Sequence, residues 1–266
     1  MLSRQLLRLS ANASKARCAR PMAIPRLARP SGTQLVGRFY STFNPKDQPR
    51  VRIGSTAPNF TVDTTEGEID FHKYIGDQWV VLFSHPADFT PVCTTELGAF
   101  ARLKPEFDQR NVKLIGLSTE GVESHKAWIK DMEDVTTGGA KFSYPIIADS
   151  DKKVAFLYDM LSEEDFNKIG GGMVPTVRSV FVIDPSKKVR LIMTYPASTG
   201  RNSAEVLRVV DALQLADSKG IATPIDWSSG EDVIIPPSIS DDAAKAKFGE
   251  FKTLKSYLRT TKSPIE

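Results

Sequence analysis

One apolar run, followed by a polar turn and then a helix start, constrains the fold of this chain more than any other feature. Val80 to Phe83 is apolar throughout and predicts a buried strand. Thr90 followed by Pro91 predicts a helix start, with Thr90 as N-cap and Pro91 as the first helical residue. The helix is expected to continue to about Phe107. This strand-turn-helix unit places Cys93 in the first helical turn.

That position favours a reactive form of Cys93. The first N–H groups of a helix lack partners within the helix, and the helix dipole is positive at this end, so a thiolate is stabilised relative to a thiol. The thiolate is the nucleophilic form. The alternative is a buried structural cysteine, which is the commonest fate of a free cysteine.

Alternating strands and helices follow along the chain. Strands are expected at 60–64, around 69, at 112–118 and at 146–149, and helices at 122–132 and 153–157. The runs 177–185 and 189–195, joined by a short polar turn, predict an antiparallel hairpin. Ser203 is expected to cap a helix over 204–213. This order predicts an α/β fold with a mixed central sheet flanked by helices.

The composition shifts toward Pro, Ser and charged residues from Lys219 onward, which predicts an extended arm leading to a small terminal unit. A last strand is expected at 256–259. Such an arm either wraps a partner subunit or lies along its own domain. The predicted organisation is a leader over 1–40, a main domain over 50–214 and a C-terminal arm domain over 215–266.

The N-terminal segment has no Asp or Glu through Lys46, and eight basic residues precede the bond after Tyr40. This composition is typical of a mitochondrial transit peptide, and Arg38 to Ser41 is similar to a matrix cleavage signal with the cut after Tyr40. A basic tail that binds nucleic acid or anionic lipid is the alternative. Removal of the eight basic residues takes the net charge from +3 to −5, which leaves nucleic-acid binding without electrostatic support. We therefore expect a mitochondrial matrix protein.

The composition also limits metal, disulfide and membrane chemistry. The other cysteine, Cys18, falls inside the predicted leader, so a disulfide framework or a thiolate-rich metal site is not expected in the mature protein. His72, His85 and His125 are separated without ligand spacing, no metal is assigned, and His125 is expected at a helix surface. No apolar stretch is long enough to cross a bilayer, so membrane insertion is not expected.

Pro86, Thr90 and Cys93 form the pattern P-x-x-x-T-x-x-C, which resembles the active-site signature of peroxiredoxins. The segments 84–97 and 195–202 resemble, more narrowly, the one-cysteine peroxiredoxin-6 class. The similarity extends from about Arg50 to the C-terminus. It implies a thioredoxin-like fold with a C-terminal arm, and a homodimer.

The resemblance implies roles for particular residues. Cys93 would attack a peroxide oxygen, and Arg178 would pair with the sulfur and hold the peroxide. Thr90 has a hydroxyl able to bond the thiolate or the substrate, and Pro86 would shield the sulfur from water. Taken without the family, Arg178 is more often a solvated strand residue and Thr90 only an N-cap.

Two further residues match the one-cysteine class and are supporting candidates. His85 is either a structural hydrogen-bond partner or a functional group. Arg201 is a candidate for an arginine network. One position departs from the class, because Gln78 stands where vertebrate members carry the serine of a lipase-type motif, so phospholipase activity is not expected.

The expected activity is thiol-dependent reduction of hydrogen peroxide and organic hydroperoxides through a sulfenic acid at Cys93, as an antioxidant. With a single cysteine, an external thiol must act as reductant, namely glutathione, glutaredoxin or thioredoxin, and no bound cofactor is expected. The alternative is a redox-sensing thioredoxin-like binding or holdase protein. A thiol-disulfide oxidoreductase is disfavoured because a C-x-x-C pair is missing, and a cysteine hydrolase because no partner set is identified.

Overall fold

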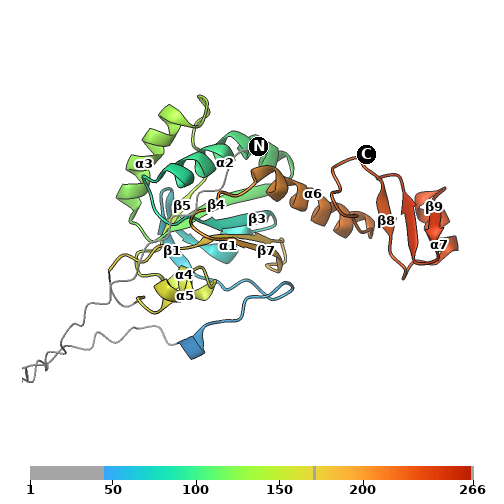
Figure 1. Ribbon diagram of the computed structural model, residues 1–266, viewed down its shortest axis with the longest axis horizontal. Coiled ribbons are helices and arrows are strands. Elements are labelled where there is room, and N and C mark those ends of the chain that lie inside the picture. Colours follow the sequence, from blue (N-terminus) through green and yellow to red (C-terminus); the bar gives the residue numbers. More distant parts are fainter. Residues whose placement is uncertain (1–44, 170–171, 265–266) are drawn as a thin grey trace, which may run out of the picture. The chain divides into compact units, whose positions relative to one another are not determined.

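The computed structural model describes residues 45–169 and 172–264 (Figure 1). Its centre is a seven-stranded mixed sheet in the order β2-β1-β5-β4-β3-β6-β7. The strands are β1 (Thr61–Thr64), β2 (Gly67–Asp70), β3 (Trp79–Ser84), β4 (Val112–Ser118), β5 (Ile146–Ala148), β6 (Arg178–Ile183) and β7 (Val189–Tyr195). β3 pairs with β4, and β4 with β5, in parallel, and the other pairings are antiparallel.

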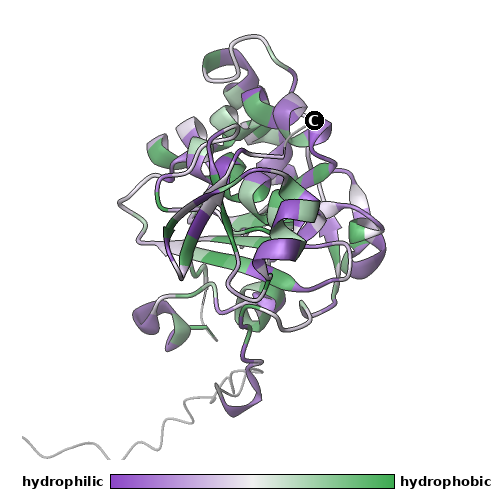
Figure 2. Ribbon diagram, turned by 90° about the vertical axis from the view of Figure 1, so that its right-hand side faces the viewer, coloured by the Kyte–Doolittle hydropathy of each residue, from purple (hydrophilic) through white to green (hydrophobic). Residues whose placement is uncertain are grey.

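Helices cover both faces of this sheet because its inner strands are apolar on both sides. Alternate residues of β3 belong to two cores: Val80 and Leu82 pack in one, and Val81 and Phe83 in the other. Figure 2 shows the sheet strands mostly hydrophobic and the helices of mixed hydropathy. The helices are α1 (Phe71–Ile75), α2 (Pro91–Gln109), α3 (Val122–Val135), α4 (Lys153–Leu157), α5 (Glu163–Phe166) and α6 (Ser203–Lys219), after a short 3₁₀ helix (Pro45–Asp47).

The two cores assign the helices to the two faces. Residues of α1 and α4 pack with Val80 and Leu82, whereas residues of α2, α3 and α6 pack with Val81 and Phe83. β3 lies between β4 and β6, and all six of its residues are buried. The turn that follows β3 is therefore anchored at the centre of the molecule's main sheet.

The C-terminal part forms a small unit of its own. It contains a three-stranded antiparallel sheet in the order β8-β10-β9 and one helix. The elements are β8 (Val233–Ile235), α7 (Asp241–Phe248), β9 (Lys252–Lys255) and β10 (Leu258–Thr261). Trp227, which is fully buried, packs with Ala212, Leu215 and Ala216 of α6.

The predicted fold class is confirmed, as are the strands and helices expected through the hairpin β6–β7. Two local expectations were wrong. Asn202, and not Ser203, caps α6, because its side chain accepts from the N–H groups of Ala204 and Glu205. Ser256 and Tyr257 form the turn between β9 and β10 instead of a strand.

The structure does not test the predicted domain bounds or the predicted leader. α6 continues across 214–215, where a domain boundary was expected, so those domain bounds stay a prediction. The expected leader, with Cys18, lies outside the described residues. Among the described helices, none combines the length and apolar character needed to span a bilayer.

Candidate active site

The turn between β3 and α2 ends at the predicted N-cap. Thr90 has extended backbone angles, φ −112° and ψ 145°, and Pro91 is the first helical residue, so this prediction is confirmed. The Thr90 hydroxyl donates a 2.9 Å hydrogen bond to the carbonyl oxygen of Ala87 and makes no cap bond to the helix. Because the hydroxyl hydrogen takes part in this bond, the hydroxyl can only accept a hydrogen bond from a bound molecule.

Cys93 is the third residue of α2, and its side chain is fully buried. Its Sγ accepts a 3.3 Å hydrogen bond from Nη1 of Arg178, the first residue of β6. β6 runs antiparallel to β3, so the start of β6 lies beside the end of β3 and brings the guanidinium to the sulfur. The sulfur thus lies at the positive end of a helix and beside a permanent cation, which together stabilise negative charge on it.

A buried carboxylate holds this guanidinium in place. Glu96, one helical turn after Cys93, accepts from Nη1 of Arg178 at 2.7 Å and from Nη2 of Arg201 at 2.8 Å through Oε2. Its Oε1 accepts from the main-chain N and from Nε of Arg201. Burial alone would raise the pKa of Glu96, but the bonds and charge of Arg201, with Arg178, outweigh it and lower that pKa. Arg178 also donates from Nε and Nη2 to the carbonyl oxygen of Ala197.

Arg201 is placed to brace Glu96. Its Nη1 donates to the carbonyl oxygens of Ser84 and Ser179, at the end of β3 and the start of β6. Its guanidinium lies over the rings of Phe83 and Phe100, 5.2 and 5.8 Å from their centroids. The predicted arginine network is therefore present, with Glu96 between its two arginines.

Pro86 and His85 lie at the start of the turn, and both are buried. Pro86 has no N–H to offer. His85 donates its main-chain N–H to Leu117, and its carbonyl oxygen accepts from the Thr176 hydroxyl. Its Nε2 lies 2.9 Å from Oδ1 of Asp88.

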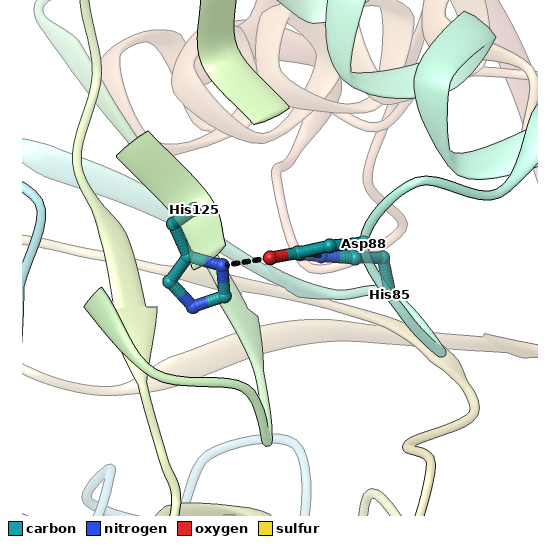
Figure 3. A group of neighbouring side chains, drawn as sticks. All are labelled: His85, Asp88 and His125. Atoms are coloured by element: carbon teal, nitrogen blue, oxygen red, sulfur yellow. Dashed lines mark hydrogen bonds and ion pairs between the residues drawn. The ribbon is translucent and has the colours of Figure 1, made fainter. Parts of the chain in front are cut away.

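The expectation that His125 lies at a helix surface was wrong, because its side chain is fully buried. α3 packs with α2 on the same face of the sheet, and this brings His125 to Asp88, with Nδ1 2.7 Å from Oδ2 (Figure 3). His85 and His125 therefore contact the two oxygens of one carboxylate. The sequence separation of the two histidines hid this cluster.

The residue types of this cluster are also those that bind metal ions. Two ligands on one tetrahedral ion lie about 3.3 Å apart when the metal-ligand bonds are near 2.0 Å. Here each histidine nitrogen lies 2.7 to 2.9 Å from a carboxylate oxygen, which is the distance of a direct hydrogen bond. The geometry fits a hydrogen-bonded chain and not a set of ligands around an ion.

Two known family models match the chain. Residues 53–192 match the AhpC/TSA family, and residues 212–250 match the C-terminal domain of 1-Cys peroxiredoxin. The chain belongs to the peroxiredoxin family. This peroxiredoxin thus has both parts of a one-cysteine member, the thioredoxin-like domain and its C-terminal extension.

Individual relatives are similar over most of their length. The mitochondrial peroxiredoxin PRX1 of Saccharomyces cerevisiae is 63% identical over 221 residues, which cover 83% of this chain and 84% of the relative. Peroxiredoxin-6 of Gallus gallus is 49% identical, with 81% of this chain and 99% of the relative covered. A solved structure of the yeast mitochondrial 1-Cys peroxiredoxin superposes with a TM-score of 0.73 at 60% identity, and covers 80% of this chain and all 100% of that one.

Peroxiredoxin 6 of Arenicola marina, solved as a cysteine-to-serine mutant, superposes with a TM-score of 0.77 at 42% identity. The match covers 81% of this chain and 100% of that one. With the yeast structure, it confirms the predicted thioredoxin-like fold of this peroxiredoxin.

Two residues of the site were not identified from the sequence. Glu96 stands three positions after Cys93, a spacing that places both on one helical face, so a carboxylate beside the cysteine could have been inferred. The role of Asp88 could not be inferred, because its partner His125 lies on α3, distant in the sequence.

Proposed function

We propose that this peroxiredoxin reduces hydrogen peroxide and small organic hydroperoxides through Cys93. The observation that carries the proposal is the 3.3 Å contact between Nη1 of Arg178 and Sγ of Cys93 in a buried site at a helix N-terminus. In the first step the thiolate attacks one peroxide oxygen. An S–O bond forms, the O–O bond breaks, and hydroxide or an alkoxide leaves, so that Cys93 becomes a sulfenic acid. The leaving group takes up a proton from solvent and becomes water or an alcohol.

The site residues supply fixed charge and acceptors for this step. Negative charge spreads over the sulfur and both oxygens as the O–O bond breaks, and Arg178, held by Glu96, directs N–H donors at it. The Thr90 hydroxyl, whose hydrogen is given to Ala87, accepts from the peroxide O–H. Pro86 adds a buried wall without a donor. Arg201 acts through Glu96.

An external thiol completes the cycle. It attacks the sulfenic sulfur, water leaves, and a second thiol releases the mixed disulfide and restores Cys93. Glutathione, with glutaredoxin, or thioredoxin is the proposed reductant. The yeast relative supports this choice, because its structure is described in terms of thiol resolution via glutathione/thioredoxin systems. Excess peroxide is expected to carry Cys93 on to sulfinic acid.

We further propose that the chain acts in the mitochondrial matrix after loss of residues 1–40, and as a homodimer. The name of the yeast relative and the acid-free, basic N-terminal segment support the location. β7 supports a dimer, because it is the last strand of the sheet, and past Val189, which bonds to Gly54 and Ser55, no described strand pairs with its outer edge. The proposed domain bounds remain 50–214 and 215–266.

Stopped-flow peroxide consumption and mass spectrometry of the mature protein after one equivalent of peroxide test the activity. We expect rapid consumption, one added oxygen on Cys93, and a glutathione adduct when glutathione is present. Cys93→Ser should abolish consumption, and Arg178→Met should slow it by at least roughly a hundredfold. Slow consumption that is insensitive to Arg178 would instead favour a redox-sensing binding protein.

A further inference from the structure

The turn that leads into α2 is under backbone strain at one residue. Phe89, directly before the N-cap, has φ +53°, a left-handed conformation that is unfavourable for a bulky side chain. Its ring is 55% exposed, so its own burial does little to hold that conformation. A strained residue persists when its neighbours fix the chain on either side. The neighbour on one side is Asp88.

Asp88 is held by groups from its own turn, from the segment after β4 and from α3. Its main-chain N–H donates to Oε1 of Glu120, which follows β4. Its side chain meets His85 Nε2 at 2.9 Å through Oδ1, and Ser124 Oγ and His125 Nδ1, both at 2.7 Å, through Oδ2. The side chain is 2% exposed. Asp88 thus ties the active-site turn to α3.

The hydrogen-bond partners determine where the protons lie. Burial alone would raise the pKa of Asp88, but the bonds from His125 and His85 outweigh it, so the carboxyl is ionised and only accepts. Both histidine nitrogens that face it must therefore carry protons. The other ring nitrogen of His125 lies 3.2 Å from the carbonyl oxygen of Ile147, a second acceptor. His125 therefore satisfies both contacts only as a doubly protonated, cationic ring.

The ring of His85, unlike that of His125, is neutral. Burial lowers the pKa of His85 in spite of the bond to Asp88, so this ring is neutral. Its proton is on Nε2, and Nδ1 is left as a bare lone pair. That Nδ1 is buried and has no hydrogen-bond partner within residues 45–169 and 172–264. An unpaired buried acceptor is costly, so its retention calls for an explanation.

The cluster is linked to the turn of α2 that carries Cys93. The ring of His85 lies 5.1 Å from that of Trp128, whose Nε1 donates to Oγ1 of Thr94, the residue after Cys93. On the other side, Ala87, next to Asp88, provides the carbonyl oxygen that takes the Thr90 hydrogen. A shift of Asp88 would therefore be felt at both Thr90 and His85.

We propose that Asp88 and His125 are positioning residues of the peroxidase site: as a buried carboxylate–imidazolium pair they hold His85 in the Nε2–H tautomer and fix the turn that sets Thr90. The proposal rests on the proposed peroxidase function, yet its protonation pattern is measurable without any turnover. Ser124 and Glu120 are the other polar groups that hold the pair.

The first test is nuclear magnetic resonance of the ring nitrogens of isotope-labelled histidine in the full chain. The signals of His72 are identified by comparison with His72→Gln, which changes a partly exposed ring bonded to Ala57, and the two remaining rings are those of His85 and His125. We expect His85 protonated on Nε2 alone, and His125 protonated on both nitrogens, as its two acceptors Asp88 and Ile147 require. A proton on Nδ1 of His85, or a His125 ring with one bare nitrogen, overturns the proposal.

The second test is Asp88→Asn, with Asp77→Asn as the matched control at an exposed position. The amide has one acceptor and one donor group, so its N–H₂ faces a ring N–H unless that ring moves its proton. We expect His85 to change tautomer and the rate constant for peroxide to fall on the order of tenfold to a hundredfold, with an altered pH profile. A changed tautomer at an unchanged rate overturns the positioning role. Absence of peroxide consumption by the unmodified protein would sink the proposed function and leave the tautomer result intact.

Discussion

Buried ion pairs hold the side chains of this site in place. Arg178 and Arg201 are almost fully buried, and one carboxylate, Glu96, contacts both. A buried charge without its partner costs far more than the pair contributes. The orientation of Arg178 toward Cys93 therefore depends on a residue that itself does not contact the sulfur.

Glu96→Gln tests this dependence. The amide keeps the size of the side chain but removes the negative charge between two guanidinium groups, so we expect a loss of about 3 kcal/mol in the free energy of unfolding. Sulfenic acid formation should slow by roughly tenfold or more, because Arg178 is less constrained. Glu106→Gln, on the same helix but in a more exposed pair with Arg110, is the control and should change both little. Equal effects of the two substitutions would contradict this account.

The residues that could be predicted from the sequence are those whose placement depends only on their neighbours along the chain. Thr90 and Cys93 follow from an N-cap pattern within one short segment, and their placement matches. The contact of Arg178 came from the family resemblance alone, since a strand arginine gives no sign of its partner. The burial of His125 could not be inferred, because it depends on the packing of α3 against the turn after β3.

At the scale of elements, α2 approaches the end of α3 closely at one glycine. A Cβ added at Gly98 would lie 2.5 Å from Cβ of Thr136, the C-cap residue that follows α3. The hydrogen bond from Arg102 to the carbonyl oxygen of Thr136 joins the same two segments. The absence of a side chain at Gly98 thus allows the helix that carries Cys93 to pack at this distance.

Gly98→Ala is expected to force the two helices apart. We expect a loss of about 1 to 3 kcal/mol in the free energy of unfolding, measured by urea denaturation. Gly116→Ala in β4 is the control, since its Cβ would meet Ile146 at an ordinary 3.5 Å. A Gly98→Ala protein as stable as the unmodified chain would show that α3 does not approach α2 so closely.

Element prediction succeeded where the apolar pattern was strong. The strands β3, β4 and β6 are buried along almost their whole length, and their apolar runs marked them. β9 is exposed at all four residues and has no such pattern, so the last hairpin was misplaced. The arm was recognised from its composition, which carries no information on strand register.

At the scale of the whole molecule, two buried carboxylates connect the elements around the site. Asp88 joins the turn after β3 to α3, and Glu96 joins α2 to β6. For each, burial acts to raise the pKa, and the hydrogen bonds outweigh it, so the pKa lies below its ordinary value of 3.8 or 4.5. Both groups titrate lower in the folded state than in the unfolded chain.

Acid should therefore destabilise the protein. The unfolded chain binds more protons at these two groups, so their stabilisation is complete above about pH 4.5 and is lost as the pH falls toward their folded values. Denaturant unfolding at a series of pH values should show a falling free energy below that point. Glu96→Gln should reduce the slope. A slope that is unchanged in this variant would assign the acid sensitivity to other groups.

The complete burial of Cys93 affects how fast a thiol can reduce it. A peroxide is a few atoms across, whereas glutathione is a tripeptide, and thioredoxin is a folded protein. Under the proposed function, a reductant of that size reaches the buried sulfur only when the first turn of α2 opens. How often that turn unwinds sets an upper limit on turnover. At some peroxide concentration, Cys93 is oxidised a second time before a thiol can reduce it. That concentration therefore depends on the stability of this helical turn as much as on the reactivity of the sulfur.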